Sequence, residues 1–401
     1  MSAPAADRAH LLDALRGFAL LGIALANYTG LSYWVFLPEK EQAQLPGAFL
    51  DATMNAFHFV LIDGKFYSIF SLLFGIGFGL FLGKGAEAMP RFLRRMLVLA
   101  LIGAMHMRLL WEGDILFLYA VLGMLLPLFR HVRDRSLVII AVALLLSPIL
   151  LDASTVLSDG RFAPAAPIHA AALAEDKSFG FEGGIPAHYV PDGGWKEFMV
   201  WQHGGWIWRI EGLIGTNRIP KVFALFLLGL WVTRRGIFRD PSAHSTLLRK
   251  VALIGAIIGL PCSVLLWWSE LHFGHVPELI GLVHTAAYAF SVVPLALAYA
   301  AGFALLWTGE RAQRILHVLA PAGRMALTNY LMQTIIALWL FTGMGLGWGA
   351  RVSPITFESL AVGVFILQVL WSHWWLKRFQ FGPMEWLWRS LTYGKVMPMR
   401  K

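Results

Sequence analysis

The chain has 401 residues, of which 58% are apolar and only 14% are charged, and its mean hydropathy is +0.63. This composition excludes a soluble globular protein that buries one core beneath a charged surface, and it predicts an α-helical membrane protein. The net charge of +9 does not predict nucleic-acid binding, because the basic residues lie in short connections between apolar runs and not on one stripe with interleaved aromatic residues.

Apolar runs long enough to cross a bilayer recur along the chain. They predict the fold class: all-α, a polytopic transmembrane helical bundle of about ten spans that forms a single membrane domain over residues 1–401. The expected spans are residues 12–36, 60–83, 92–110, 114–130, 136–152, 219–234, 250–269, 280–307, 316–341 and 355–376.

The charges of the connections predict the orientation of these spans. Basic residues collect in alternate connections, whereas the short connections on the other side hold little beyond Lys40, Arg108 and Arg351. Since basic connections stay in the cytoplasm, we expect an even number of spans with both termini cytoplasmic. In a bacterium this describes a multi-pass protein of the inner (plasma) membrane, with membrane lipids as its neighbours.

The first span carries polar residues in helical register. Arg16 and Asn27 are about three turns apart, so they share one face of the helix. Two interpretations fit. Either Arg16 anchors the helix at the cytoplasmic surface while Asn27 joins two helices, or both residues line a functional site.

The second hydrophobic region covers residues 56–83 and is interrupted by Asp63-Gly64-Lys65. We expect an outer interfacial piece before the interruption and the span after it. Asp63 and Lys65 either pair at the outer interface or serve a site within the bundle. Glycines further on have the spacing of close helix packing, either within the bundle or in a homo-oligomer.

Residues 105–116 join two apolar runs and are expected to form the tip of a helical hairpin. The tip holds His106, Arg108, Glu112 and Asp114. Polar groups at the edge of hydrocarbon cost desolvation energy unless they are paired or wet, so this cluster is the foremost candidate site. A capped helix end at the interface is the alternative interpretation for His106.

Two amphipathic helices are expected in the plane of the membrane. The first lies in the long outer (periplasmic) loop, residues 153–218, whose tryptophan-rich second half begins at Trp195. It either shapes an outer-facing substrate cleft or only anchors the loop. The second is a cytoplasmic interfacial helix at residues 383–394, which starts with proline, ends at glycine and precedes a basic tail that suits anionic headgroups.

Metal binding is not predicted. His272 and His275 are three residues apart, but Gly274 between them and the lack of a third ligand at a recognised spacing favour a solvated loop. Cys262 lies within an apolar run, which leaves neither a disulfide framework nor a thiolate metal site. The lone histidines on apolar faces, His58, His284 and His373, are expected to be hydrogen-bonded core residues.

The ninth span opens with Arg324 in its first turn, where a cation opposes the helix dipole unless an anion lies beside it. Asn329 and Gln333 follow, one turn apart. These two side chains either hydrogen-bond neighbouring helices together or contact a substrate.

Five motifs follow one another along nearly the whole chain. They are Leu12-Asp13-Ala14-Leu15-Arg16-Gly17-Phe18, Gly64-Lys65-Phe66, His106 with Trp111 to Leu116, Gly323-Arg324-Met325-Ala326-Leu327-Thr328-Asn329-Tyr330-Leu331, and Gly382-Pro383 through Leu391-Thr392. Together they resemble the YeiB-like bacterial inner-membrane family, a family of unknown function.

More distantly, the first span resembles that of transmembrane acyltransferases, including the acyltransferase-three proteins and heparan-α-glucosaminide N-acetyltransferase. In the acyltransferase-three pattern, an arginine is followed at the spacing of Arg16 and Asn27 by a histidine that the transfer needs. Arg16 matches the arginine, but Asn27 stands where the histidine is expected. An amide is no general base, so we expect His106 to take that role.

The resemblance and the hairpin tip favour acyl transfer across the membrane. An acyl-CoA would supply the acyl group and bind through its phosphates at Arg16 and Arg324, with no metal. His106, oriented by Asp114 or Glu112, would deprotonate a hydroxyl or amine of an outer-facing lipid, glycan or small molecule.

Other polar residues would support this reaction. Asn27 and Lys65 would donate hydrogen bonds to the developing oxyanion. Trp111, Asn329 and Gln333 would contact the substrate.

Two alternatives stay open: a transporter or lipid translocase with Arg16, Lys65, Asp114 and Arg324 along a polar pathway, and an assembly partner without turnover. A transporter is expected to have interrupted helices that meet near the membrane midplane. An acyltransferase of the favoured kind needs a space with a basic mouth that joins Arg16, at one end of the bundle, to His106.

Overall fold

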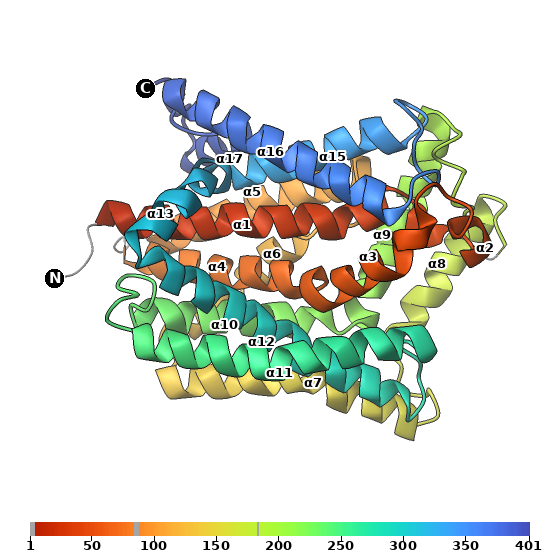
Figure 1. Ribbon diagram of the computed structural model, residues 1–401, viewed down its shortest axis with the longest axis horizontal. Helices are drawn as coiled ribbons and strands as arrows, with labels where there is room; N and C mark the ends of the chain where they lie inside the picture. Colours follow the sequence, from red (N-terminus) through yellow and green to blue (C-terminus); the bar gives the residue numbers. More distant parts are fainter. Residues whose placement is uncertain (1–4, 84–87, 183) are drawn as a thin grey trace.

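The computed structural model describes residues 5–83, 88–182 and 184–401. In these residues every regular element is a helix, as the composition predicts (Figure 1). The α-helices are α1 (Ala5–Leu31), α2 (Glu39–Gln42), α3 (Asp51–Phe57), α4 (Lys65–Leu82), α5 (Ala88–Leu109), α6 (Leu116–Gly123), α7 (Asp134–Leu157), α8 (Ala166–Ser178), α9 (Trp195–Gly215), α10 (Arg218–Arg234), α11 (Ser245–His272), α12 (Gly281–Trp307), α13 (Glu310–Leu316), α14 (Ala320–Arg324), α15 (Ala326–Phe341), α16 (Pro354–Arg378) and α17 (Pro383–Tyr393).

Six helical segments among the described residues are long and apolar enough to cross a membrane, and the bent pair α9 and α10 makes a seventh if it counts as one span. The predicted count of about ten is therefore not confirmed. The difference arises where expected spans form shorter or more charged helices. α6 has 8 residues and α15 has 16, while α5 carries arginines at positions 91, 94 and 95.

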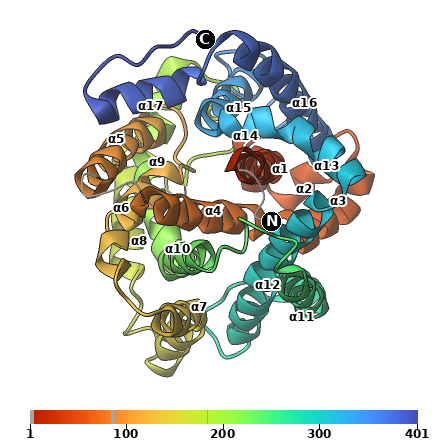
Figure 2. The same ribbon diagram turned by 90° about the vertical axis from the view of Figure 1, so that its left-hand side faces the viewer.

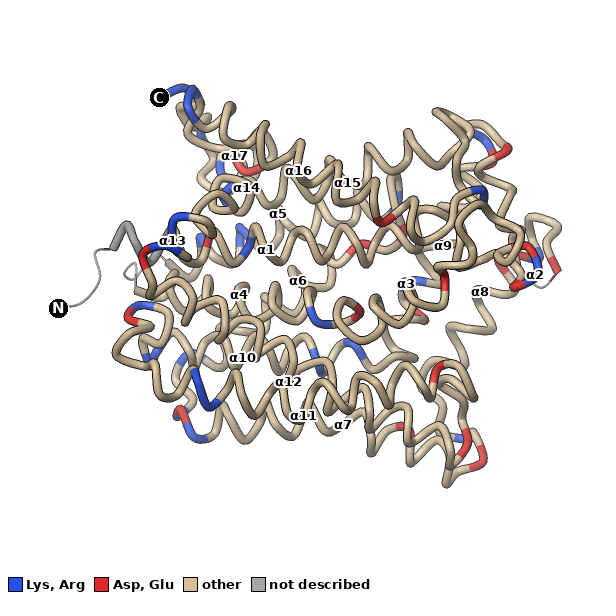
Figure 3. The backbone as a smooth tube through the Cα atoms, in the orientation of Figure 1, with Lys and Arg blue, Asp and Glu red and all other residues tan. Residues whose placement is uncertain are grey.

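The two ends of the bundle differ. Figure 1 shows the start of α1 and the C-terminus at one end, called the terminal end here, and α2 and α8 at the opposite, far end. Figure 3 shows several basic residues along the terminal end, and acidic and basic residues also within the bundle. The charge bias predicts that the terminal end is cytoplasmic, and this orientation stays a prediction.

Two helices are interrupted. α3 continues through a π-helical turn, His58–Ile62, breaks at Asp63 and Gly64, and resumes as α4. Gly64 has a φ of 75°, a conformation that favours glycine. The second interruption separates α9 from α10, which meet at a bend of 67° where Asn217 has a φ of 50°. The first interruption confirms the expected break, and the second falls at the end of the long loop.

α1 lies at the centre of the bundle, as the end view in Figure 2 shows, and packs against α4, α14, α15 and α16. Its contact with α14 is between backbones: a Cβ atom on Gly323 would lie 1.8 Å from the Asp13 carbonyl oxygen. Small residues allow this approach, which fixes the terminal end of α1.

α4 and α10 pack through glycines. A Cβ atom on Gly75 would lie 2.1 Å from the Phe226 carbonyl oxygen, and one on Gly229 would lie 2.2 Å from the Leu72 carbonyl oxygen. The expected small-residue packing is therefore used inside the bundle. This glycine contact holds α4 and α10 together along the part of each helix that follows its interruption.

Replacing Gly75 by alanine is expected to destabilise the protein by about 1–3 kcal/mol, because the new methyl group would push α10 away from α4. Gly77→Ala on the same helix is the matched control, since a Cβ atom there has no neighbour within 4 Å. Unfolding of both variants by sodium dodecyl sulfate in mixed micelles measures the difference. Equal stabilities would contradict the close packing.

Candidate functional site

The expected hairpin tip forms between α5 and α6, which are joined by residues 110–115. The two helices approach closely because Gly103 has no side chain: a Cβ atom there would lie 2.4 Å from the Phe117 nitrogen. This approach brings His106 on α5 next to Asp114 in the turn.

His106 and Asp114 form a buried pair, with only 2% and 1% of their surfaces exposed. His106 Nδ1 lies 2.8 Å from Asp114 Oδ2. Because a carboxylate only accepts hydrogen bonds, Nδ1 donates and Nε2 is the acceptor. Nε2 lies 3.0 Å from Thr334 Oγ1 on α15, so the Thr334 hydroxyl donates to a histidine that Asp114 holds in one tautomer.

The neighbours of Asp114 fix its position. Asp114 Oδ1 accepts a hydrogen bond of 2.7 Å from the Phe117 N–H. Its carbonyl oxygen accepts two from Arg209 of α9, at 3.0 Å from Nε and 2.7 Å from Nη2. The rings of Tyr330 and Trp111 lie 5.2 Å and 6.5 Å from the His106 ring, between centroids. The imidazole is thus held in one orientation, as a general base requires.

Glu112 does not orient His106. Its carboxylate accepts hydrogen bonds from Trp201 Nε1 at 3.1 Å and Gln202 Nε2 at 3.3 Å, both on α9. Burial raises the pKa of Glu112 above its usual range, although these bonds oppose the change. Of the two carboxylates expected beside His106, the structure therefore places Asp114 there, while Glu112 attaches α9 to the hairpin.

Arg16 and Arg324, the expected phosphate-binding pair, lie together at the terminal end. Arg16 Nη1 donates to Asp13 Oδ1 at 2.6 Å. Arg324 is exposed, donates from Nη2 to the Gln380 carbonyl oxygen at 3.2 Å and interacts electrostatically with Asp13. The two guanidinium groups therefore face one end of the bundle.

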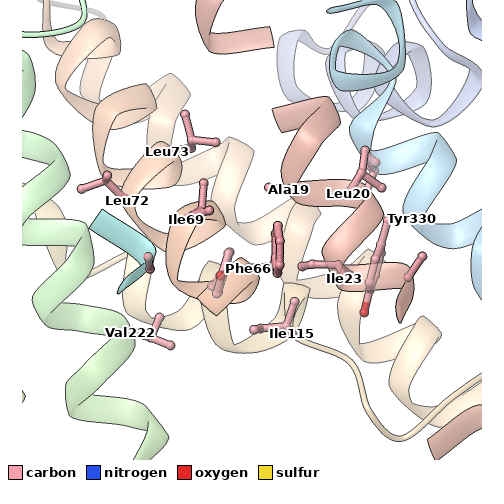
Figure 4. Packing of buried hydrophobic residues seen from close by; sticks show 14 of the residues in the cluster. Ala19, Leu20, Ile23, Phe66, Ile69, Leu72, Leu73, Ile115, Val222 and Tyr330 are labelled. Atoms are coloured by element: carbon pink, nitrogen blue, oxygen red, sulfur yellow. The ribbon is translucent and has the colours of Figure 1, made fainter. Parts of the chain in front are cut away.

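The expected open space between Arg16 and His106 is not formed. Figure 4 shows Leu20 and Ile23 of α1 packed with Tyr330, Ile115 and Phe66, all buried residues of the core. Phe66 lies so close to α1 that a Cβ atom on Gly22 would fall 2.0 Å from its ring. The physical reason is that this stretch of α1 is apolar, so it packs against its neighbours instead of lining a wet channel.

The expected oxyanion donors lie elsewhere. Lys65 is fully buried at the start of α4, where its Nζ donates to the Phe59 carbonyl oxygen at 2.6 Å. Asn27 is partly buried on α1. The hydrogen-bond partners of His106 include neither residue. The geometry thus lends no support to their proposed role.

Asn329 and Gln333 join α15 to α16. Asn329 Nδ2 donates to Ser372 Oγ at 3.0 Å, and Gln333 Nε2 donates to Gln368 Oε1 at 2.9 Å. The helix-packing interpretation therefore accounts for their amide nitrogens. Their carbonyl oxygens are buried with no hydrogen-bond partner among the described residues.

Glu385 of α17 holds the start of α15, the helix that carries Thr334. Its Oε1 accepts from the backbone N–H groups of Leu327 at 2.7 Å and Thr328 at 3.1 Å, and its Oε2 accepts from Thr328 Oγ1 at 2.6 Å. First-turn amides have no partner within their own helix, so Glu385 caps α15 from another helix. α17 is helical over Pro383–Tyr393, and an interfacial position on the cytoplasmic side stays a prediction.

The stability of the protein is expected to depend on Glu385 as pH changes. Burial raises the pKa of Glu385 above its usual value of 4.5, so the folded protein binds this proton more tightly than the unfolded chain does. Stability should therefore fall as pH rises from that usual value through the raised pKa. Glu385→Gln keeps the shape and cannot titrate. Thermal unfolding at several pH values should show this fall in the wild type only, and parallel curves would contradict it.

The lone histidines are hydrogen-bonded, as expected. His58 Nδ1 lies 3.1 Å from Glu358 Oε1, and His284 Nε2 lies 3.0 Å from Glu270 Oε2. Over the described parts of the chain, no group of three or more histidine, cysteine or acidic side chains is arranged to hold a metal ion.

The sequence did not mark Thr334 or Arg209 as members of the site. Thr334 is 228 residues from His106, and only its place one turn after Tyr330 hints at a shared face. In the sequence, Arg209 is one basic residue of the tryptophan-rich segment after Trp195, and nothing near it indicates a contact with Asp114. Both reach the hairpin through contacts between distant helices.

Comparison with known proteins places the chain among uncharacterised relatives. A family model described as "Protein of unknown function (DUF418)" matches residues 232–395. The uncharacterised protein YxaH of Bacillus subtilis is 30% identical, with 98% of this chain and 96% of that protein covered. The uncharacterised protein YeiB of Escherichia coli is also 30% identical, with 98% of each chain covered. An uncharacterised 39.9 kDa protein of Bacillus acidopullulyticus is 29% identical, with 98% of this chain and 96% of that protein covered.

Proposed function

The chain belongs to the YeiB-like family of membrane proteins, whose function is unknown, and we propose that it is an inner-membrane acyltransferase that works through His106. One observation carries the proposal: the buried hydrogen-bonded unit Thr334, His106 and Asp114. A hydroxyl bonded to a histidine, with that histidine oriented by a carboxylate, is the arrangement that activates a nucleophile.

The proposed reaction has two steps. In the first, Thr334 Oγ1 attacks the carbonyl carbon of an acyl-CoA thioester and passes its proton to His106 Nε2. The C–S bond breaks, His106 returns the proton to the sulfur, and CoA leaves as a thiol. In the second step an acceptor hydroxyl or amine attacks the Thr334 ester, again through His106, and the proton ends on Thr334 Oγ1. Asp114 stabilises the imidazolium in both steps.

The acyl donor would bind at the terminal end. Arg16 and Arg324 lie together there, and guanidinium groups suit the phosphates of CoA. Since apolar side chains fill the route along α1, we propose that α1 and α4 separate at the contact of Gly22 with Phe66 to let the acyl arm reach Thr334. An acyl chain of a phospholipid would need no such opening from the cytoplasm, so it is the competing donor.

A transfer assay tests the proposal. Purified protein in nanodiscs receives acetyl-CoA with a labelled acetyl group, or a phospholipid with labelled acyl chains, together with membrane extract as the source of acceptors. We expect label from acetyl-CoA to reach the extract only when the protein is present. Label from the phospholipid alone would overturn acyl-CoA as the donor, and no transfer from either would overturn the function.

The second candidate function is transport of a solute or lipid, which the two interrupted helices favour. α4 and α10 both begin within the bundle with a basic residue, Lys65 and Arg218, and interrupted helices often form the binding sites of carriers. Exchange of labelled solutes from a cell extract across proteoliposomes tests this function. Exchange without acyl transfer would replace the first candidate by the second.

A further inference from the structure

A pocket beside the second interruption takes no part in the proposed reaction. It has a volume of about 90 Å³ and lies between α7, α10, α12 and the connection that follows α11. Its polar lining consists of Asp152, Thr216, Asn217, Lys221, His275, His284, Thr285 and Tyr288. A buried water needs roughly 10–15 Å³, so the pocket has room for several waters or for one phosphate group.

Lys221 is the principal cation of this pocket. Only 5% of its surface is exposed, and its Nζ donates to the Thr216 carbonyl oxygen at 2.7 Å. The same Nζ lies 3.9 Å from the centroid of the Tyr288 ring. An ammonium group has three N–H donors, so this arrangement leaves two donors for a ligand.

Arg218 lies outside the lining of the pocket but places a second cation one turn earlier on α10. Its guanidinium carbon lies 5.0 Å from the centroid of the Tyr67 ring, and its buried Nε has no hydrogen-bond partner among the described residues. The two rings belong together, since the Tyr67 and Tyr288 hydroxyl oxygens are 3.1 Å apart. Two neighbouring cations thus rest on aromatic faces with most of their donors unused.

The acidic residues nearby do not take up these donors. Asp152 accepts from Asn217 Nδ2 at 2.7 Å, from His275 Nε2 at 2.9 Å and from Thr285 Oγ1 at 2.6 Å. Asp63 attracts both cations electrostatically, but within the described chain it forms no ion pair with either. The unsatisfied groups are therefore mainly donors, and a ligand that fits them must bring acceptor oxygens.

The fold places both cations where an anion is most strongly attracted. Lys221 and Arg218 lie in the first turn of α10, the positive end of its dipole. Cations there destabilise the helix unless negative charge lies beside them.

We propose that this pocket binds a phosphate group, held by Lys221 and attracted by Arg218. The group is either a dissolved phosphate compound or the phosphate of a lipid headgroup. The site does not depend on the acyltransferase reaction, because none of its residues contacts His106, Asp114 or Thr334 through a hydrogen bond.

Thermal unfolding in detergent tests the site, with inorganic phosphate compared to sodium chloride at equal ionic strength. Phosphate should raise the midpoint for the wild type and for Lys250→Met, whose lysine is exposed on α11. For Lys221→Met, the phosphate concentration that gives half of the shift should rise about tenfold or more. Arg218→Gln should weaken binding in the same direction, which keeps the test decisive if Lys221→Met does not fold.

A second arm separates the two sources. In phosphatidylglycerol nanodiscs, a further shift with inorganic phosphate identifies a dissolved ligand. If inorganic phosphate causes no further shift in these nanodiscs, and the unfolding midpoint of the wild type is higher than that of Lys221→Met, the ligand is the lipid headgroup. Equal phosphate shifts in all variants, or no effect of phosphate or lipid on any, would overturn the site. His106→Gln should keep the phosphate shift, so failure of the acyltransferase reaction would leave this result unchanged.

Discussion

His106→Gln is expected to lower the rate of acyl transfer about 10²–10⁴-fold, the usual contribution of a general base. Glutamine fills similar space and can hydrogen-bond Thr334 or Asp114, but it cannot take the proton that Thr334 must lose. The effect should appear in the rate of transfer at saturating donor and leave donor binding nearly unchanged, since neither Arg16 nor Arg324 is a hydrogen-bond partner of His106. Initial rates in the labelled acetyl-CoA assay measure it.

His58→Gln is the matched control for this substitution. His58 is also a largely buried histidine bonded to a carboxylate, with Glu358 Oε1 at 3.1 Å and 12% of its side-chain surface exposed. A general loss of stability from breaking such a pair would lower transfer in both variants. Loss in His106→Gln alone supports the base, whereas wild-type rates in His106→Gln would exclude it.

Thr334→Val is expected to abolish transfer by the proposed route, because valine has nearly the shape of threonine but no hydroxyl to carry the acyl group. The loss should be at least as large as that of His106→Gln, since nucleophile and base act as one unit and their effects do not add. It also leaves His106 Nε2 buried without a donor, which costs about 1–3 kcal/mol of stability. Rates must therefore be measured well below the unfolding temperature.

Thr334→Ser is the control that separates the two effects. Serine keeps the hydroxyl and should retain transfer within about tenfold, while the smaller side chain lowers stability slightly. If Thr334→Val transferred acyl groups at the wild-type rate, His106 would deprotonate the acceptor directly. Thr334 would then only hydrogen-bond the histidine. That result would remove the covalent step from the mechanism.

Local sequence signals predicted the elements whose causes are local. The break at Asp63 and Gly64 follows from a charged, glycine-containing interruption of an apolar run, and the helix from Pro383 to Gly394 follows from its end residues. The hairpin tip also forms as expected, because Glu112, Gly113 and Asp114 interrupt two apolar runs and lie in the connection between α5 and α6. These features depend on a few neighbouring residues.

Features that depend on packing between distant segments could not be read from the sequence. Thr334 meets His106 through the position of α15, which Glu385 caps from another helix. Arg209 reaches Asp114 because α9 packs on the hairpin, where Glu112 accepts from two of its side chains. The open route along α1 was expected from charges at its two ends, yet the apolar residues between them decide the packing. Charge marks candidate residues, and packing decides which of them meet.

Peptide mass spectrometry after incubation with acetyl-CoA, without acceptor, shows whether Thr334 carries the acyl group. We expect one acetyl group on Thr334 of the wild-type protein, none on the Thr334 peptide of His106→Gln, and loss of the group when membrane extract is added. Full labelling of acceptors by the wild type with no acetyl group on Thr334, and equal labelling by His106→Gln, would contradict it.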